Sequence, residues 1–444
     1  MDAAPRFEAL RMPPATAWPQ DIPGGGGLVA RFLRAGGSQS AVSVPHSRCF
    51  NKRVLETHHM SLQGGLLPQS PELAPDPRRL AMRGVHRAIS DLRRGTPVLI
   101  FQNETALLVC AAETLGASGL ADIASGGLAA PVLLLAPTRA AALLRRPVTQ
   151  AEDQAVVALR LPALMLDPAR LRGFADPTAE SLLPAEAEQI SPPPLAGAAL
   201  ALAKLGRLLP ALVAAPAAAG VAERLSLLRV PAEDVLSYPI SAAASLKRVA
   251  EARVPLEDAP EARIIAFRAA DGGIEHLAIL VGDPEASAAA GQAPLARAHS
   301  ECFTGDLLGS LRCDCGPQLR GAIKRMAEDP AGGVLLYLAQ EGRGIGLVNK
   351  LRAYTMQDRG LDTLDANRAL GYGADERNFL VAATMLREVG MTSVRLLTNN
   401  PDKLSGLAAC GIEVVGREAH SFDPNGVNDA YLDTKARRFG HMLG

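Results

Sequence analysis

The feature that most constrains the fold is an alternation of short apolar runs with helical periods from about Leu246 onward. Strands are expected at residues 264–267 and 276–281, paired across a turn-like Asp-Gly-Gly at 271–273. Further strands are expected at 334–338, 394–398 and 412–415, and helices at 318–326, 348–358 and 378–389. Alternating strands and helices predict an α/β fold, in which a mostly parallel sheet carries helices on its faces. We therefore expect one domain over residues 236–444.

The preceding part of the chain has a similar but weaker pattern. A helix is expected at 83–94, a strand at 96–101, a strand or buried helix at 107–113, and an apolar run at 132–135. Residues 184–235 are rich in Ala, Leu and Pro with few charges, which favours broken helices and a connector. These segments together predict a second α/β domain over residues 79–235.

The first segment, residues 1–78, is interrupted by Pro and Gly and keeps no apolar period. It is typical of a disordered leader, or of a start placed too far upstream with initiation at Met60. The irregular spacing of its potential metal ligands does not indicate a metal site; these are His46, Cys49, His58 and His59.

Composition excludes several classes of protein. The 444 residues include 46 Lys and Arg and 46 Asp and Glu, so the net charge is zero. A neutral chain argues against binding to nucleic acid or to a membrane surface. Because no apolar run reads as a membrane span or a secretory signal, and six cysteines are too sparse for a disulfide scaffold, we expect a cytoplasmic protein.

Three of the six cysteines are clustered: Cys302, Cys313 and Cys315. Thiolates at this spacing can converge on one metal ion, and they suit zinc. Three protein ligands leave a fourth tetrahedral position for water, as in a catalytic site. A structural zinc with a further ligand, or three free buried thiols, would fit the same spacing.

Three other motifs carry polar groups, and two of them follow expected strands. A Gly-rich turn at 342–346 lets backbone N–H groups approach an anion, and Arg343 favours phosphate. Asp375 and Arg377 lie two residues apart, and Thr398 precedes a polar turn that contains Lys403. Considered singly, these motifs are more typical of a tight turn, a surface ion pair and an ordinary loop than of a ligand site.

Taken together and in this order, the motifs resemble GTP cyclohydrolase II, an enzyme of riboflavin biosynthesis. The resemblance runs from about Leu246 to His441, from an opening Leu-Lys-Arg-Val-Ala-Glu at 246–251 to a closing Tyr-Leu-Asp-Thr-Lys at 431–435. It implies an α/β/α layered domain that hydrolyses GTP to 2,5-diamino-6-ribosylamino-4(3H)-pyrimidinone 5′-phosphate, formate and pyrophosphate. It also implies a homodimer.

The resemblance assigns roles to individual residues. The three clustered cysteines would hold one zinc ion that supplies water for attack at carbon 8 of guanine. Arg377 corresponds to the proposed nucleophile at the α-phosphorus, Asp375 to its general base, and Tyr354 to a tyrosine near the guanine. Mg²⁺ would accompany the triphosphate. The positions that match GTP contacts are Arg297, Ala298, His299, Ser300, Glu301, Gln318, Glu341, Gly342, Arg343, Thr363, Thr398 and Lys403.

Residues 85–113 faintly resemble the start of 3,4-dihydroxy-2-butanone 4-phosphate synthase, a domain that often precedes this cyclohydrolase. That synthase needs an acidic cluster around Mg²⁺, whereas this chain has Gln-Asn-Glu-Thr-Ala at 102–106. One acid cannot replace several around a divalent cation. We therefore expect a degenerate, inactive domain; an unrelated domain is the alternative.

Two other functions fit parts of the pattern. One is a paralogue that acts on another nucleotide, for example in pyrimidine catabolism. The other is a nucleotide-binding scaffold without turnover. Asp375, Arg377 and all three clustered cysteines are present, which favours the working cyclohydrolase over both.

Overall fold

The computed structural model describes residues 76–145, 156–179, 181, 183–184 and 186–442. Nearly all of the predicted leader therefore lies outside the described residues, including Met60 and the four scattered His and Cys residues. The described residues, from Asp76 onward, belong to one compact unit.

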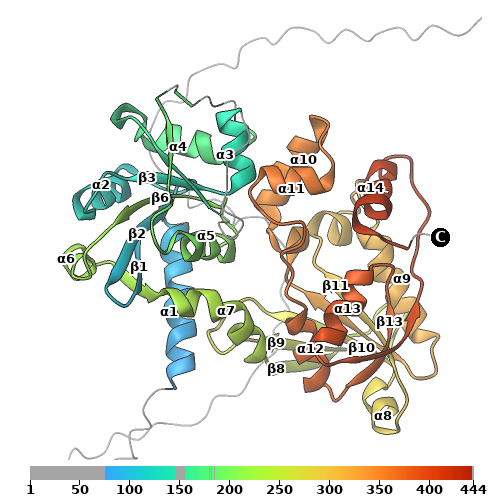
Figure 1. Ribbon diagram of the computed structural model, residues 1–444. Helices are drawn as coiled ribbons and strands as arrows, with labels where there is room; N and C mark the ends of the chain where they lie inside the picture. The colour runs from blue at the N-terminus through green and yellow to red at the C-terminus, as the bar shows by residue number, and fades with distance from the viewer. Residues whose placement is uncertain (1–75, 146–155, 180, 182, 185, 443–444) are drawn as a thin grey trace, which may run out of the picture. The chain divides into compact units, whose positions relative to one another are not determined.

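The N-terminal region is built on a seven-stranded sheet with the order β5-β4-β3-β6-β2-β1-β7 (Figure 1). Its strands are β1 (Val98–Gln102), β2 (Thr105–Ala111), β3 (Val132–Leu135), β4 (Val157–Arg160), β5 (Glu188–Ile190), β6 (Ala211–Pro216) and β7 (Leu228–Pro231). All neighbouring strands run antiparallel except β1 and β7.

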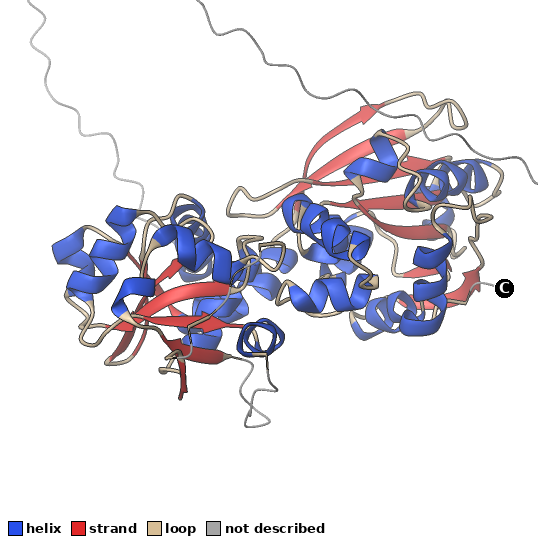
Figure 2. Cartoon of the chain, turned by 90° about the horizontal axis from the view of Figure 1, so that it is seen from above, coloured by secondary structure: helices blue, strands red, loops and turns tan. Residues whose placement is uncertain are grey.

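Helices cover both faces of this sheet (Figure 2). They are α1 (Pro77–Arg93), α2 (Ala117–Gly126), α3 (Pro137–Leu144), α4 (Pro168–Ala175), α5 (Ala196–Leu205), α6 (Val221–Leu225) and α7 (Ala232–Ala244), with a short 3-10 turn at Ala163–Met165. Alternate residues of each strand face opposite layers. Ile100 packs toward α1, α5 and α7, whereas Leu99 and Leu108 pack toward α2 and α4.

The C-terminal region has a second seven-stranded sheet with the order β14-β13-β11-β12-β10-β9-β8. Its strands are β8 (Lys247–Arg253), β9 (Arg263–Arg268), β10 (His276–Val281), β11 (Leu295–Ser300), β12 (Gly333–Leu338), β13 (Ser393–Leu397) and β14 (Glu413–Glu418). The β14, β13, β11 and β12 strands are parallel, whereas β12, β10, β9 and β8 pair antiparallel.

This sheet lies between two helical layers, as an α/β/α fold requires. Leu336 and Leu338 pack with helices α12 and α13, and Leu335 packs with α9 on the other face. The helices of the region are α8 (Pro284–Ala289), α9 (Cys315–Ala327), α10 (Leu347–Asp358), α11 (Thr363–Ala369), α12 (Phe379–Glu388), α13 (Pro401–Ala409) and α14 (Asp429–Phe439). Two short turns are a π-helical turn at Phe303–Leu307 and a 3-10 turn at Glu341–Gly344.

The two regions share a hydrophobic core. Met356, Leu370 and Tyr372, from α10, α11 and the loop beyond, belong to the same buried cluster as Leu135 and Leu209 of the N-terminal region. The domain boundary predicted after residue 235 falls inside α7, which contacts both α1 and α12.

Two expectations about the fold are wrong. The C-terminal sheet is mixed rather than mostly parallel, because strand pairing is set by contacts distant in sequence. Residues 184–235 are not a connector with broken helices: they contain β6, a strand in the middle of the first sheet. Its Ala-rich run Ala211–Pro216 has helical propensity, and burial between two strands overrides that weak preference.

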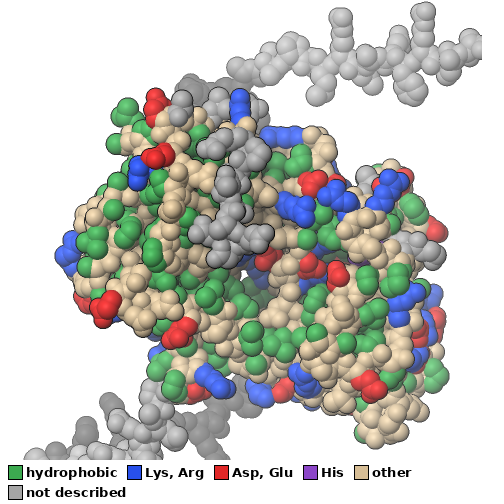
Figure 3. Space-filling view, viewed as in Figure 1, with side chains coloured by type: hydrophobic (Ala, Val, Ile, Leu, Met, Phe, Trp, Pro, Cys, Tyr) green, Lys and Arg blue, Asp and Glu red, His purple; other side chains and the backbone are tan. Residues whose placement is uncertain are grey.

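Within the described residues, none of the helices has both the length and the apolar character needed to cross a membrane. On the face drawn in Figure 3, basic and acidic side chains are interspersed, as expected for a chain of zero net charge.

Candidate active site

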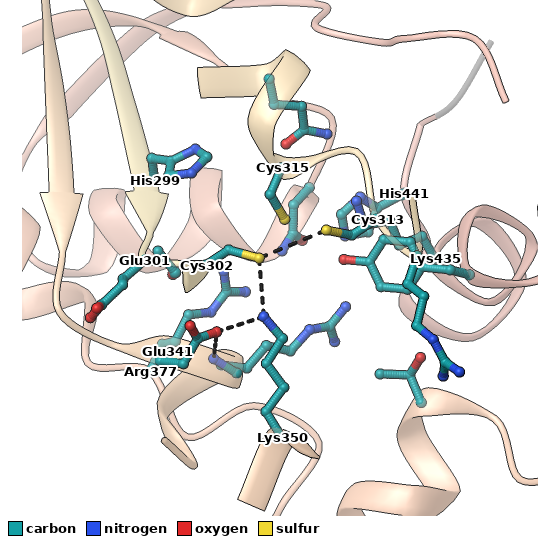
Figure 4. A pocket seen from close by; sticks show the side chains of 18 of the residues that line it. His299, Glu301, Cys302, Cys313, Cys315, Glu341, Lys350, Arg377, Lys435 and His441 are labelled. Carbon is teal, nitrogen blue, oxygen red and sulfur yellow. Dashed lines mark hydrogen bonds and ion pairs between the residues drawn. The ribbon is translucent and has the colours of Figure 1, made fainter. Parts of the chain in front are cut away.

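Three cysteine thiols converge between the end of β11 and the start of α9 (Figure 4). The Sγ atoms of Cys302 and Cys313 are 3.7 Å apart, and the three thiols lie within 4.8 Å of one another. Gly305 lies against them: a Cβ at that position would be 2.7 Å from the Cys313 Sγ and 2.9 Å from the Cys302 Sγ. The loop therefore needs glycine there to leave room for the sulfurs.

The donor set and its spacing fit a soft divalent metal. Zinc–thiolate bonds of about 2.3 Å in a tetrahedron place two sulfurs roughly 3.8 Å apart, close to the observed 3.7 Å. Hydrogen bonds from Cys313 and Cys315, and the nearby ammonium of Lys350, lower the pKa of Cys302. The thiolate form, which metals require, is thus favoured at Cys302.

Asp306 fixes the loop that carries the first cysteine. Its Oδ2 accepts hydrogen bonds from the Cys302 backbone N–H at 2.9 Å and from the Tyr337 hydroxyl at 3.0 Å. The Nε2 of His299 lies 3.1 Å from both Asp306 carboxylate oxygens. Burial lowers the pKa of His299, so its imidazole is neutral at pH 7. A neutral ring donating to Asp306 orients the carboxylate toward the cysteine loop.

Lys350, on α10, was not singled out from the sequence. Its ammonium donates to the Cys302 Sγ at 3.0 Å, the Thr304 hydroxyl at 3.1 Å and the Glu341 Oε1 at 2.8 Å. Although burial alone would lower its pKa, the Cys302 thiolate and Glu341 raise it, which keeps Lys350 charged. Lys350 therefore links the cysteine cluster to the Gly-rich turn.

The predicted Gly-rich turn follows β12 and leads into α10. Arg343 has a φ of +62°, a left-handed conformation that is uncommon for residues other than glycine. A Cβ at Gly344 would meet the Glu376 carbonyl oxygen at 2.8 Å, so glycine is required there too. The buried Glu341 accepts hydrogen bonds from the Phe303 backbone N–H at 2.7 Å and from Lys350. The turn is thus tied directly to the cysteine loop.

Arg377 and Asp375 form a paired contact. Arg377 donates from Nε to Asp375 Oδ1 at 2.8 Å and from Nη2 to Oδ2. Burial would raise the pKa of Asp375, but the hydrogen bonds and charge of Arg377 lower it. Among the described residues the Arg377 Nη1 has no hydrogen-bond partner, and Arg377 lines the cavity. One nitrogen of this guanidinium is therefore available to a ligand.

Three cationic side chains of the same cavity, Arg297, Arg343 and Lys403, have no carboxylate partner among the described residues. Burial, and then the charges of Arg377, Arg297 and Lys435, lower the pKa of Lys403 well below its usual value. Burial also lowers the pKa of Arg297 to about 10, and its buried Nε has no hydrogen-bond partner. The Lys403 ammonium donates to the Ala298 carbonyl at 2.8 Å. Such uncompensated positive charge favours binding of a polyanion.

The C-terminal tail lies beside these three cations, Arg297, Arg343 and Lys403, which we call the cationic wall. The Arg343 guanidinium stacks on the Phe439 ring at 3.6 Å, and the Met442 backbone N–H donates to the Asn399 carbonyl at 2.9 Å. Burial and the charges of Lys435, Arg343 and two other cations lower the pKa of His441 to about 3. Its buried Nε2 has no hydrogen-bond partner and lines the cavity.

Tyr354 lies on α10 at another part of the cavity wall. Its hydroxyl is 3.5 Å from the Thr304 hydroxyl, and the Arg312 guanidinium lies 5.1 Å above its ring. Thr363, at the start of α11, accepts a hydrogen bond from the Gln357 side chain at 3.2 Å. An aromatic face beside polar groups of this kind suits a planar heterocycle.

The structure brings together nearly all residues that the sequence singled out. Two of the predicted site residues, Asp375 and Ala298, do not line the cavity. Asp375 is bonded to Arg377, and the Ala298 carbonyl accepts a hydrogen bond from Lys403. Those that line the cavity are Arg297, His299, Ser300, Glu301, Cys302, Cys313, Cys315, Gln318, Glu341, Gly342, Arg343, Tyr354, Thr363, Arg377, Thr398 and Lys403.

Several lining residues had no role assigned from the sequence, namely Arg312, Lys350, Asn367, Asn399, Asn400, His420, Tyr431, Lys435 and His441. Tyr431 and Lys435 belong to the closing motif of the resemblance, so a signal for them was present. Lys435 donates to Asp314 at 2.6 Å across 121 residues of sequence, a pairing that spacing could not indicate.

Comparisons with known proteins agree with this geometry. The GTP cyclohydrolase II family model matches residues 247–419. A GTP cyclohydrolase-2 from Azospirillum brasilense is 50% identical over 383 residues, covering 84% of this chain and 97% of that protein. One from Actinobacillus succinogenes is 49% identical over 200 residues, covering 45% of this chain and 89% of that protein. The Azospirillum alignment thus extends into the N-terminal region.

Among solved structures, similarity was found to a two-domain 3,4-dihydroxy-2-butanone 4-phosphate synthase from A. baumannii. It has a TM-score of 0.29 and 17% identity, covering 76% of this chain and 99% of that chain.

Proposed function

Because this chain belongs to the GTP cyclohydrolase II family, we infer that it hydrolyses GTP in riboflavin biosynthesis. The products are 2,5-diamino-6-ribosylamino-4(3H)-pyrimidinone 5′-phosphate, formate and pyrophosphate. The observation that carries this proposal is a single cavity whose wall holds three converging thiols and a set of unpaired cations. A purine triphosphate needs both, one for the ring and one for the phosphates.

The metal is part of the proposal. The family is metal-dependent, and we propose zinc, held by Cys302, Cys313 and Cys315. When bound there, zinc would supply a Lewis acid and activated water for hydrolysis of the guanine ring. Lys350 and Asp306 hold Cys302 from two sides, and the neutral His299 orients Asp306. The residues of the chain thereby fix the hydrolytic end of the cavity.

The cationic wall is proposed to bind the triphosphate with its Mg²⁺. Lys403, Arg343 and Arg297 supply charge, and the orphan nitrogens of Arg297 and His441 would gain phosphate oxygens as partners. Hydrogen bonds to charged oxygens are strong in a dry site. The depressed pKa of Lys403 would rise again once phosphate neutralises its neighbours.

Arg377 is the proposed nucleophile at the α-phosphorus. A bond from its free Nη1 to phosphorus would form as the α–β bridging P–O bond breaks, releasing pyrophosphate. Water would later cleave this N–P bond to give the free 5′-phosphate and restore Arg377. The guanidinium must lose a proton in this step, and Asp375, bonded to Nε and Nη2, is the proposed acceptor. The lowered pKa of Asp375 makes it a weak base, so the pairing also suits a purely orienting role.

Tyr354 is proposed to contact the guanine, with Thr363 nearby. A homodimer and a cytoplasmic location are further parts of the proposal that rest on the family resemblance.

For the N-terminal region we propose no synthase activity. Within 102–106, Asn103 and Glu104 form a two-residue hairpin turn between β1 and β2, with Asn103 at a φ of +53° and Glu104 exposed. Within the described residues of that region, no cluster of three His, Cys, Asp or Glu ligand atoms occurs.

The test is product analysis of the purified full chain with GTP and Mg²⁺. Formate and pyrophosphate should appear in equal amounts, together with the pyrimidine nucleotide. ATP is the matched control, because it carries the same triphosphate on a different purine and should release no formate. Turnover of ATP with no turnover of GTP would reject guanine as the substrate base.

A further inference from the structure

The segment 204–208, which comprises the last two residues of α5 and the three that follow, belongs to the N-terminal region but contacts the loops of the candidate active site. Four hydrogen bonds leave this short segment. In two of them the segment donates: Lys204 Nζ to Glu376 Oε1 at 2.7 Å, and Arg207 Nη2 to the Ala339 carbonyl at 2.5 Å. In the other two it accepts: the Arg207 carbonyl from Asn349 Nδ2 at 2.9 Å, and the Leu208 carbonyl from the Tyr372 hydroxyl at 2.6 Å. Every one crosses more than 130 residues of sequence.

Lys204 acts on the loop that presents Arg377. Its partner Glu376 lies between Asp375 and Arg377, and the same Oε1 accepts the Gly373 backbone N–H at 2.6 Å. The Glu376 backbone N–H donates to the Arg343 carbonyl at 3.0 Å. One carboxylate therefore closes loop 371–377 and, through Lys204, anchors it to the N-terminal region.

Arg207 acts on the Gly-rich turn. It has a φ of +55°, and its side chain lies against Gly346, where a Cβ would be 2.9 Å from the Arg207 Cδ. Its guanidinium caps the carbonyl of Ala339, two residues before Glu341. The strained backbone and the close packing indicate that this contact is specific rather than incidental.

A second set of contacts joins the N-terminal region to α10. Glu113 accepts from the Leu209 backbone N–H at 2.8 Å and pairs with Arg352 at 2.9 Å, and Arg352 also pairs with Asp176. Arg352 lies on α10, two residues from Lys350 and Tyr354. The N-terminal region thus contacts all three elements that carry the proposed reacting groups: α10, the Gly-rich turn and loop 371–377.

We propose that Lys204 and Arg207 are positioning residues for GTP hydrolysis, through which the N-terminal region holds Arg377 and the Gly-rich turn in their working geometry. The proposal rests on the proposed function and assigns a role to a region that needs no chemistry of its own. Side chains of Lys204 and Glu376 are 32% and 27% exposed, so the ion pair contributes little to global stability. Its effect belongs to local geometry.

The experiment compares Lys204→Met with Arg160→Met in the full chain. Arg160 forms an equally short ion pair, 2.7 Å to Glu188, on the β4–β5 edge of the N-terminal sheet and away from the cavity. Each variant is measured for kcat and KM with GTP, for thermal unfolding, and for hydrogen exchange of the peptide covering 371–377. Lys204→Arg tests rescue, and Lys204→Met with Glu376→Gln completes a double-mutant cycle.

Lys204→Met should lower kcat about tenfold with little change in KM, since misplacing a reacting group by a fraction of an ångström affects the transition state most. The Gly373 and Glu376 amides should exchange faster, the unfolding temperature should match that of Arg160→Met, and Lys204→Arg should recover most activity. Unchanged kcat together with unchanged exchange would overturn the proposal. Faster exchange in a preparation that never acts on GTP would instead reject the proposed function and leave the positioning contact standing.

Discussion

The two sheets of this protein have the same number of strands and the same covering by helices, but their strand ends differ. In the C-terminal sheet, β11, β12 and β13 are adjacent and parallel, so their carboxyl ends meet at one edge. The cysteine loop, the Gly-rich turn and the Thr398 turn all begin there. In the N-terminal sheet, antiparallel pairing closes strand ends with turns, as at Asn103 and Glu104. The contrast explains why the groups of the candidate site converge at one edge of the C-terminal sheet.

The largest expected effect comes from the cysteine cluster. Cys313→Ser should lose the bound zinc, and formate release should fall on the order of 1000-fold, because a hydroxyl is a poor ligand for a soft metal. Metal content and formate release check this. Cys410→Ser is the matched control, since Cys410 is a free cysteine outside the cluster. Full zinc occupancy in Cys313→Ser would contradict the assignment.

Arg377→Ala should affect both steps of the reaction. If phosphoryl attack comes first, the variant should lose pyrophosphate and formate together, by about 100-fold or more. Cys313→Ser should differ by still releasing pyrophosphate and leaving GMP. Arg387→Ala, on the partly exposed end of α12, is the control. Pyrophosphate formation by Arg377→Ala at close to the wild-type rate would show that the Asp375 contact is a structural ion pair.

The cationic wall should yield smaller effects that fall on binding. Lys403→Met should raise KM for GTP about tenfold, and His441→Ala about threefold, according to the usual values of charged and neutral hydrogen bonds. Changes in kcat should be minor for both. Lys247→Met, which removes an exposed lysine paired with Glu388, should leave KM unchanged. If all three variants had the wild-type KM for GTP, the proposal that the triphosphate binds to the cationic wall would be wrong.

Much of the candidate site could be predicted from the sequence because its residues lie in short motifs. Cys302, Cys313 and Cys315 span one loop, and Arg377 stands two residues from Asp375. Lys350 and His441 could not be found in this way, because the first meets Cys302 across 48 residues and the second returns to the cavity from the end of the chain. Their positions depend on tertiary packing.

The fold shows the same division. Helix α12 and strand β12 were expected close to their observed limits, because amphipathic or apolar periods are local signals. The pairing of β9 with β10 was also expected, because a short turn joins these two apolar runs. The antiparallel pairing of β10 with β12 and the strand β6 were not, since strand direction and the choice between a buried strand and a helix are decided by neighbours far away in sequence.

The most direct test of the comparison offers both substrates to the same purified full chain. With GTP and Mg²⁺, we expect equimolar formate and pyrophosphate. With ribulose 5-phosphate and Mg²⁺, we expect no dihydroxybutanone phosphate above a blank without protein. Two results would contradict the proposal that only the C-terminal region is catalytically active and that it acts on GTP. One is turnover of ribulose 5-phosphate, and the other is a failure of a zinc-loaded sample to release formate from GTP.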